Sequence, residues 1–184
     1  VLSRRVDSAQ VTPNLNSLIA SRIGVAIHDA IRLSWVNPTR IKALEALGLP
    51  AHKYVVNPEG PVPDGMIDVR TEQRTDKVID GWTVSGEYDL VIAGQLMDTK
   101  TTKGFVIQKR LHDAKWMMQG SIYRWLNPEV ITDDSVVIEC IVLDWAAAAA
   151  RAAPEYPQQQ WVGLRLTLKS YQETESFIRT KLAE

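Results

Sequence analysis

Residues 86–101 read GEYDLVIAGQLMDTKT, and this stretch decides the expected fold. Ala93 and Gly94 separate two apolar runs, and glycine readily adopts the positive φ that a tight hairpin turn needs. A turn at these two residues places Asp89 directly opposite Asp98 on the next strand. The Cβ atoms of such paired residues lie roughly 4.5 to 5.5 Å apart. The sequence therefore predicts two aspartates side by side on one small surface of a sheet.

Two more charged residues are expected beside these aspartates. Side chains alternate between the faces of a strand, so Glu87 and Lys100 are predicted to share the face of Asp89 and Asp98. Two carboxylates about 5 Å apart repel by roughly 3 kcal/mol at an effective dielectric of 20, so something positive is expected between them. A divalent cation fits, and oxygen ligands favour Mg²⁺ or Mn²⁺. The alternative is a solvated hairpin with an Asp–Lys salt bridge, in which Glu87 only pairs with Lys100.

A hard cation beside a lysine suits phosphodiester hydrolysis, because the ion activates water and the ammonium stabilises the developing charge. The whole chain has a formal charge of −1 and a pI of about 6.4, so contact with a nucleic acid requires a local basic patch. One candidate is residues 99–125, where Asp113 is the only acidic residue. The cations there are Lys100, Lys103, Lys109, Arg110, Lys115 and Arg124. A solvated helix face explains the same pattern.

The remaining patterns predict helices and strands on both sides of the hairpin. Apolar spacing of three or four predicts helices over residues 15–35, 39–47, 109–126 and 171–182. Strand character occurs in residues 66–70, 78–83, 88–92, 95–99, 135–145 and 161–170. The Pro- and Gly-rich stretch 48–65 is expected to be loop, and the alanine tract after residue 145 a connector. This order is that of an α/β or α+β single domain over residues 1–184, and we favour α/β with a central mixed sheet flanked by helices.

Three groups of residues occur in an order that resembles a known nuclease superfamily. His28 ends the stretch GVAIH on the first expected helix, the aspartates and Lys100 form D(x)8DxK on the hairpin, and QGSIY contains Gln119 and Tyr123. In this order and spacing they resemble the PD-(D/E)XK superfamily, specifically its RecB-like branch, which includes phage exonucleases. The resemblance covers roughly residues 17–126. It implies a restriction-endonuclease-like core.

The resemblance also implies roles for these residues. In that branch a helix-borne histidine and two acidic residues bind the catalytic metal, which maps onto His28, Asp89 and Asp98 as ligands of Mg²⁺ or Mn²⁺. The lysine of DxK is catalytic, which maps onto Lys100. A plainer interpretation of His28 is a satisfied histidine beside the apolar stripe of its helix. Cys140 is the only cysteine, so the iron–sulfur cluster of some relatives is not expected.

The later helix carries a row of side chains that extends the candidate site. Gln119 and Tyr123 are four residues apart and project together, and Trp116 and His112 continue the row. By resemblance, Gln119 and Tyr123 lie beside the metal and contribute to activity and DNA contact. Aromatic and amide groups there suit stacking on unpaired bases and hydrogen bonding to phosphate. Ordinary half-buried packing is the alternative.

The function expected from these features is a Mg²⁺- or Mn²⁺-dependent deoxyribonuclease, an exonuclease in phage-type DNA processing or recombination. The alternatives are a DNA-end-binding or assembly module that does not cut, and a hydrolase of another phosphoester. The expected partners are DNA ends, with single-stranded ends included, and either another protein or a second copy of this chain. The apolar run 135–153 is interrupted by Glu139, Asp144 and Arg151, so no membrane span is expected, and a cytoplasmic location, the host's for a phage protein, is favoured. The chain begins at Val1 rather than Met, which leaves a preceding segment open.

Overall fold

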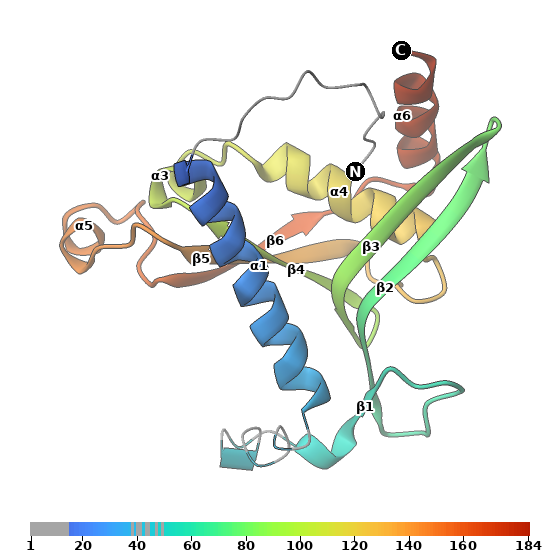
Figure 1. Cartoon of the computed structure of the whole chain (residues 1–184), viewed down its shortest axis with the longest axis horizontal. Coiled ribbons are helices and arrows are strands. Elements are labelled where there is room, and N and C mark those ends of the chain that lie inside the picture. The colour runs from blue at the N-terminus through green and yellow to red at the C-terminus, as the bar shows by residue number, and fades with distance from the viewer. Residues whose placement is uncertain (1–14, 38, 40–41, 43–44, 47, 49) are drawn as a thin grey trace.

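The computed structural model describes residues 15–37, 39, 42, 45–46, 48 and 50–184. Its centre is a six-stranded mixed sheet in the order β1-β2-β3-β4-β5-β6 (Figure 1). The strands are β1 Tyr54–Val56, β2 Ile67–Ile79, β3 Trp82–Ile92, β4 Gln95–Thr102, β5 Ser135–Val142 and β6 Trp161–Thr167. The helices are α1 Leu15–Val36, α3 Gly104–Gln108, α4 Asp113–Leu126, α5 Ala147–Ala152 and α6 Tyr171–Ala183, with a 3₁₀ turn η1 at Ala51–Lys53. The α/β class and the mixed sheet are therefore confirmed.

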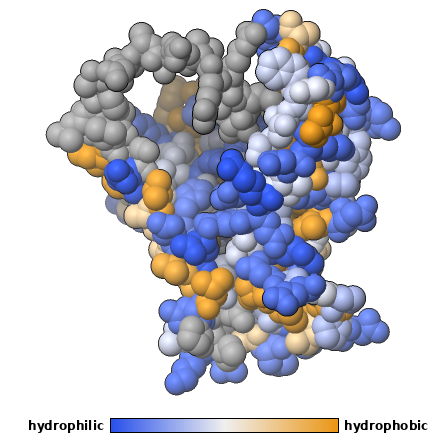
Figure 2. All heavy atoms as spheres, turned by 45° about the vertical axis from the view of Figure 1, so that its right-hand side comes forward, coloured by the Kyte–Doolittle hydropathy of each residue, from blue (hydrophilic) through white to orange (hydrophobic). Residues whose placement is uncertain are grey.

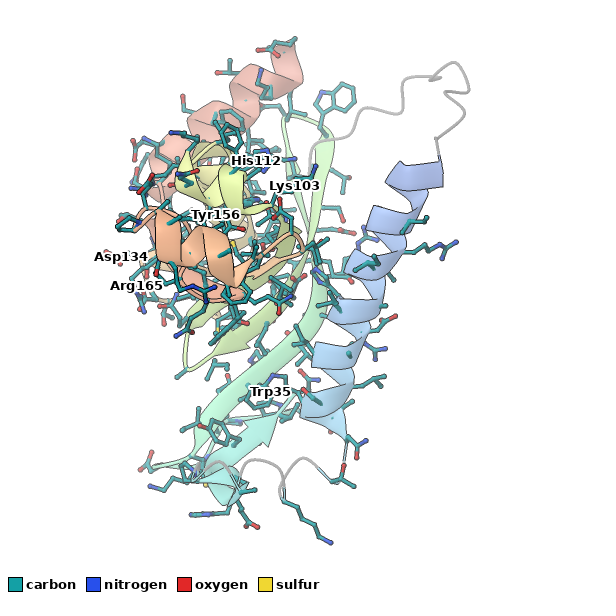
Figure 3. All side chains as sticks on the ribbon, turned by 90° about the vertical axis from the view of Figure 1, so that its left-hand side faces the viewer. Trp35, Lys103, His112, Asp134, Tyr156 and Arg165 are labelled. Carbon is teal, nitrogen blue, oxygen red and sulfur yellow. The ribbon has the colours of Figure 1, made fainter. Side chains whose placement is uncertain are left out.

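Helices cover both faces of the sheet. Figures 1 and 3 show α1 on one face and α4 with α6 on the other. Trp116 and Tyr123 of α4 pack into a core with Ile138 of β5, and Ile122 joins a second core with Ile178 of α6. These apolar contacts hold α4 against the sheet. They thereby set the position of the row of side chains that contains Gln119 and Tyr123. Figure 2 shows hydrophilic side chains over the middle of one face of the molecule, with smaller hydrophobic patches below and beside them.

The hairpin turn at Ala93 and Gly94 has the register that the sequence predicts. Both residues have positive φ, 49° and 83°, and Ile92 pairs with Gln95 directly before and after the turn. The half-solvated strand predicted in 161–170 is also confirmed, because Leu166 is buried while the neighbouring Arg165 is exposed.

A long β2–β3 hairpin replaces two of the short strands that the sequence suggests. The stretches 66–70 and 78–83 are not separate strands: β2 runs through residues 67–79, and Asp80 and Gly81 form the turn into β3 with φ of 51° and 78°. This part of the hairpin is largely exposed, so its sequence, TEQRTDK at residues 71–77, is polar. The sequence therefore lacks the apolar alternation that predicts a strand. Figure 1 shows the hairpin projecting beyond the rest of the sheet toward α6.

Other boundaries also differ from the sequence prediction. The helix expected over 109–126 begins at Asp113, after the short helix α3 and a turn. The stretch 48–65, expected to be loop, contains β1, which pairs parallel with β2. The connector after residue 145 contains α5, and β5 ends at Val142. The helix predicted at 39–47 falls largely outside the described residues. None of the described helices is long and apolar enough to cross a membrane.

Gly120 lets α4 approach the sheet closely, and this contact generates a prediction. A Cβ atom at Gly120 would lie 2.9 Å from Leu168 Cδ2 and 3.2 Å from Val136 Cβ. We expect Gly120→Val to lower the free energy of unfolding by about 1 to 3 kcal/mol through overpacking. Ala114→Val, on the exposed side of the same helix, costs less than about 0.7 kcal/mol. Urea unfolding of both variants measures the difference, and equal losses would contradict the close packing of α4.

Candidate functional site

The candidate site lies where β3 and β4 part. Only residues 90–92 of β3 pair with β4, and beyond Leu90 and Met97 the strands separate. From there β3 continues beside β2, while β4 continues beside β5, with Asp98 paired to Ile138. The predicted direct backbone pairing of Asp89 with Asp98 is therefore wrong, because the ladder ends one residue earlier. Side chains fill the gap between the strands instead.

The ladder on the other side of Asp89 is interrupted as well. Thr71 pairs with Leu90 and Gln73 with Tyr88, and Glu72, which lies between them opposite Asp89, is not paired and has a φ of 46°. Positive φ is unfavourable for a residue with a side chain and often marks a functional position. Asp89 thus lies where both neighbouring ladders break, which frees its carboxylate to reach groups on other elements.

Asp89 links α1 to β4. Its Oδ2 lies 3.1 Å from Nδ1 of His28 and accepts a hydrogen bond of 3.2 Å from the Thr99 amide. The hydrogen bond to Asp89 is the largest influence on the pKa of His28 and raises it; burial of the imidazole opposes this, as does the charge of Lys100. Close approach at Gly24, where a Cβ would lie 3.5 Å from Thr101 Oγ1, seats α1 on the sheet.

Asp98 and Lys100 form the charged centre of the site. Lys100 Nζ lies 2.7 Å from Asp98 Oδ2, and Asp98 is only 3 % exposed. Oδ1 of Asp98 is buried and has no hydrogen-bond partner among the described residues. The pKa of Asp98 is raised to about 6: burial is the largest cause, the charge of Lys100 opposes it, and the charge of Asp89 adds to the rise. A carboxylate this deeply buried is costly, which argues against a merely structural ion pair.

Gln119 and Tyr123 reach the same region from α4. The Gln119 amide donates to the Tyr123 hydroxyl over 2.8 Å. Burial raises the pKa of Tyr123 to about 12; the hydrogen bond from Gln119 lowers it, and the charges of Asp98 and Asp89 add to the rise. The charges of Asp89 and Asp98 therefore influence both His28 on α1 and Tyr123 on α4. The structure thus brings together the residues of the three sequence motifs.

Two secondary candidates lie differently from the prediction. Glu87 is exposed and paired across the hairpin with Arg74, and the ion pair of Lys100 is with Asp98 rather than with Glu87. Trp116 is 5 % exposed and belongs to the core, where its indole cannot stack on a base. Its ring meets that of His112 edge to face at 5.4 Å, and His112 itself is exposed just before α4.

Arg32 is a site neighbour that the sequence interpretation did not include. It is four residues after His28, so helical spacing alone places both on one side of α1. Its Nε lies 3.0 Å from Oε2 of Glu72, the residue with positive φ opposite Asp89. A small cavity of about 10 Å³ lies among these groups, which is barely the room that one water molecule needs.

The donor set suits a hard divalent cation, but the donors are not gathered around one point. Two carboxylates and an imidazole share the site, and Asp98 Oδ1 is a buried oxygen without a partner. Across the described residues, however, no three His, Cys, Asp or Glu side chains lie closely enough together to hold a metal ion. Asp98 contacts Lys100 and Asp89 contacts His28, so ion binding requires these pairs to open.

Comparison of the chain with protein-family models, curated proteins and solved structures gives no match.

The charges of the site predict how stability depends on pH. The pKa of His28 is raised above 6.5, and that of Asp98 is raised from 3.8 to about 6, so the folded chain holds more protons than the unfolded chain near neutral pH. We therefore expect the free energy of unfolding to fall as the pH rises from 5 to 8. Glu173 has a pKa lowered to about 2, so its contribution changes below this range.

Urea unfolding at several pH values tests this expectation. His28→Gln and Asp98→Asn should each flatten the slope between pH 5 and 8. His52→Gln, at an exposed histidine in η1, should leave it unchanged. A parent whose stability rises through this range would contradict the assignment.

The buried pair gives a second prediction. Lys100→Met should lower the free energy of unfolding by roughly 3 to 5 kcal/mol, because it leaves the Asp98 carboxylate buried without its cation. Combined with Asp98→Asn, which removes the charge, the same change should cost less than Lys100→Met alone, because no charge is then buried without its partner. A double-mutant cycle measured by urea unfolding gives the coupling, and simple additivity of the two changes would contradict it.

Proposed function

We propose that the protein is a metal-dependent nuclease that hydrolyses DNA phosphodiester bonds, with exonuclease action on ends, in DNA processing or recombination of the phage type. The observation that carries the proposal is the Asp98 carboxylate, buried with one unpartnered oxygen and 2.7 Å from Lys100. Asp89 and His28 lie beside this pair. Metal-dependent hydrolysis of phosphodiesters uses acidic and cationic groups of this kind in one site.

Asp98, Asp89 and His28 are the residues that would hold Mg²⁺ or Mn²⁺. A bound ion of this kind activates water and neutralises charge on the phosphate oxygens. The Asp98 pKa of about 6 leaves its carboxylate mostly ionised at neutral pH, as a ligand must be. Only a neutral imidazole can bind an ion, so the raised pKa of His28 opposes ion binding as the pH falls.

Lys100 and the α4 pair have separate parts in the proposed reaction. The ammonium of Lys100 lies beside the carboxylate and stabilises negative charge that develops on the phosphate. The Tyr123 hydroxyl accepts the Gln119 hydrogen bond, so its own proton is free for a second acceptor. With a pKa of about 12, Tyr123 keeps that proton at neutral pH, so toward a bound group it acts as a hydrogen-bond donor and not as a base.

The stretch after β4 supports binding of the DNA backbone. Lys103 directly precedes α3, Lys109 and Arg110 follow it, and the side chain of Phe105 between them is 57 % exposed. Figure 3 shows Lys103 and His112 toward the same end of the molecule. Cations attract phosphates and an exposed aromatic ring can stack on an unpaired base. We infer that DNA approaches the site along this segment.

The proposal includes a restriction-endonuclease-like core. Its support is the mixed sheet with α1 on one face and α4 on the other, and the acidic residues at the point where the sheet splits. A DNA-end-binding module that does not cut is a second candidate. The observation that favours it is the lack of three gathered metal donors among the described residues.

Digestion of DNA distinguishes the two candidates. End-labelled linear DNA and closed circular DNA are incubated with Mg²⁺, Mn²⁺ or EDTA and resolved on a gel. We expect the folded parent to degrade the linear DNA only, and only with a divalent cation. The double change of Asp98→Asn with Lys100→Met should lower the rate at least about 100-fold while the chain stays folded.

Lys53→Met is the matched control, since this lysine is exposed in η1, apart from the site. It should cut at the parent's rate. Linear DNA left intact by the folded parent with both metals would contradict a nuclease, and DNA binding without cutting would then identify the second candidate.

A further inference from the structure

The outer side of α1 is an exposed apolar stripe. Ile19, Ile23 and Leu33 are 49 %, 41 % and 50 % exposed, and the side chains of Ala26 and Ala30 between them are exposed as well. At 100° per residue these five positions lie within about 40° of one line along the helix. Soluble helices normally turn such a stripe toward the core.

The spacing of this stripe is that of a coiled coil. The steps between successive members are four, three, four and three residues, which is the a/d pattern of two interlocking helices. Two alanines near the centre allow another backbone to approach closely. The stripe therefore fits a second helix better than a flat surface or a small molecule.

The stripe is not the side by which α1 contacts its own sheet. Gly24 and His28 face the strands, as does Trp35, whose ring meets that of Tyr54 edge to face at 5.7 Å. Figure 3 shows α1 with one side toward the strands and no other described helix or strand against the opposite side. One face of α1 therefore packs on the sheet, and the stripe on the opposite face can make a second, different contact.

We propose that the stripe binds the same stripe of a second copy of this chain, with the two α1 helices antiparallel. Arg22 and Asp29 flank the stripe on one side. In an antiparallel pair centred between Val25 and Ala26, Arg22 of each copy lies opposite Asp29 of the other, because both are equally far from the centre. In a parallel pair, Ile27 of the other copy would lie opposite Arg22, and Ser34 would lie opposite Asp29. Neither charged residue would then face an opposite charge.

Asp29 is available for this contact. Its Oδ1 lies 3.6 Å from Arg32 Nη2, but Arg32 makes a closer ion pair of 3.0 Å with Glu72. Each copy carries one positive and one negative residue beside the stripe. The surface is therefore complementary to itself, as a two-fold dimer requires. About four turns of helix bury an area at the low end of stable interfaces, so the association depends on concentration.

Sedimentation velocity of the full chain over a range of concentrations tests the pairing. The parent's average mass should rise toward that of a dimer. Ile23→Glu should weaken association at least about tenfold. Val25→Glu is the matched control on the same helix: Val25 is 52 % exposed but about 120° away from the stripe, so its association should match the parent's.

Charge reversal separates a second copy from any other occupant of the stripe. Arg22→Glu alone and Asp29→Lys alone should each weaken association, and the two together should restore it. All these positions are exposed, and circular dichroism verifies that the helix remains folded. A parent that stays monomeric at every concentration, or a double variant that does not recover, would overturn the proposal. None of these results depends on nuclease activity.

Discussion

A carboxylate buried beside one ammonium, Asp98 with Lys100, is the constraint on which the site depends. The pair lies just beyond the point where β3 leaves β4. Burial raises the pKa of Asp98 to about 6, while Lys100 keeps its charged form accessible. A raised pKa caused by burial beside a specific charge partner is a feature that functional sites often share.

Much of the fold follows from local patterns in the sequence. Ala93-Gly94 specifies a turn, and the register of β3 on β4 follows from it. The spacing of apolar residues gives α1 and α6 with nearly correct ends. The β2–β3 hairpin was not predicted because its exposed middle lacks the apolar alternation that marks a strand, although Asp80-Gly81 is a strong turn signal. Packing over long distances in sequence determines such an element.

The sequence could indicate that the three motifs of the site lie near one another but not how their side chains contact each other. The order of His28, D(x)8DxK and the later Gln and Tyr named the residues that the structure gathers. Extending the ladder by one residue placed Asp89 opposite Asp98, whereas the break at Glu72 and the end of the β4 ladder redirect Asp89 to His28. Burial of Trp116 agrees with the alternative of half-buried packing, because the row on α4 faces partly into the core. Neither effect is visible in residue spacing.

Binding of Mn²⁺ to the full chain tests the central claim most directly, because the signal of the free ion in electron paramagnetic resonance disappears on binding. The account predicts saturable binding by the folded parent at neutral pH. It also predicts loss of that binding in Asp98→Asn, with Asp64→Asn, in the loop before β2, as the matched control that keeps it. A folded parent that leaves the Mn²⁺ signal unchanged, or an Asp98→Asn variant that binds like the parent, would contradict the assignment of the buried carboxylate to a metal site.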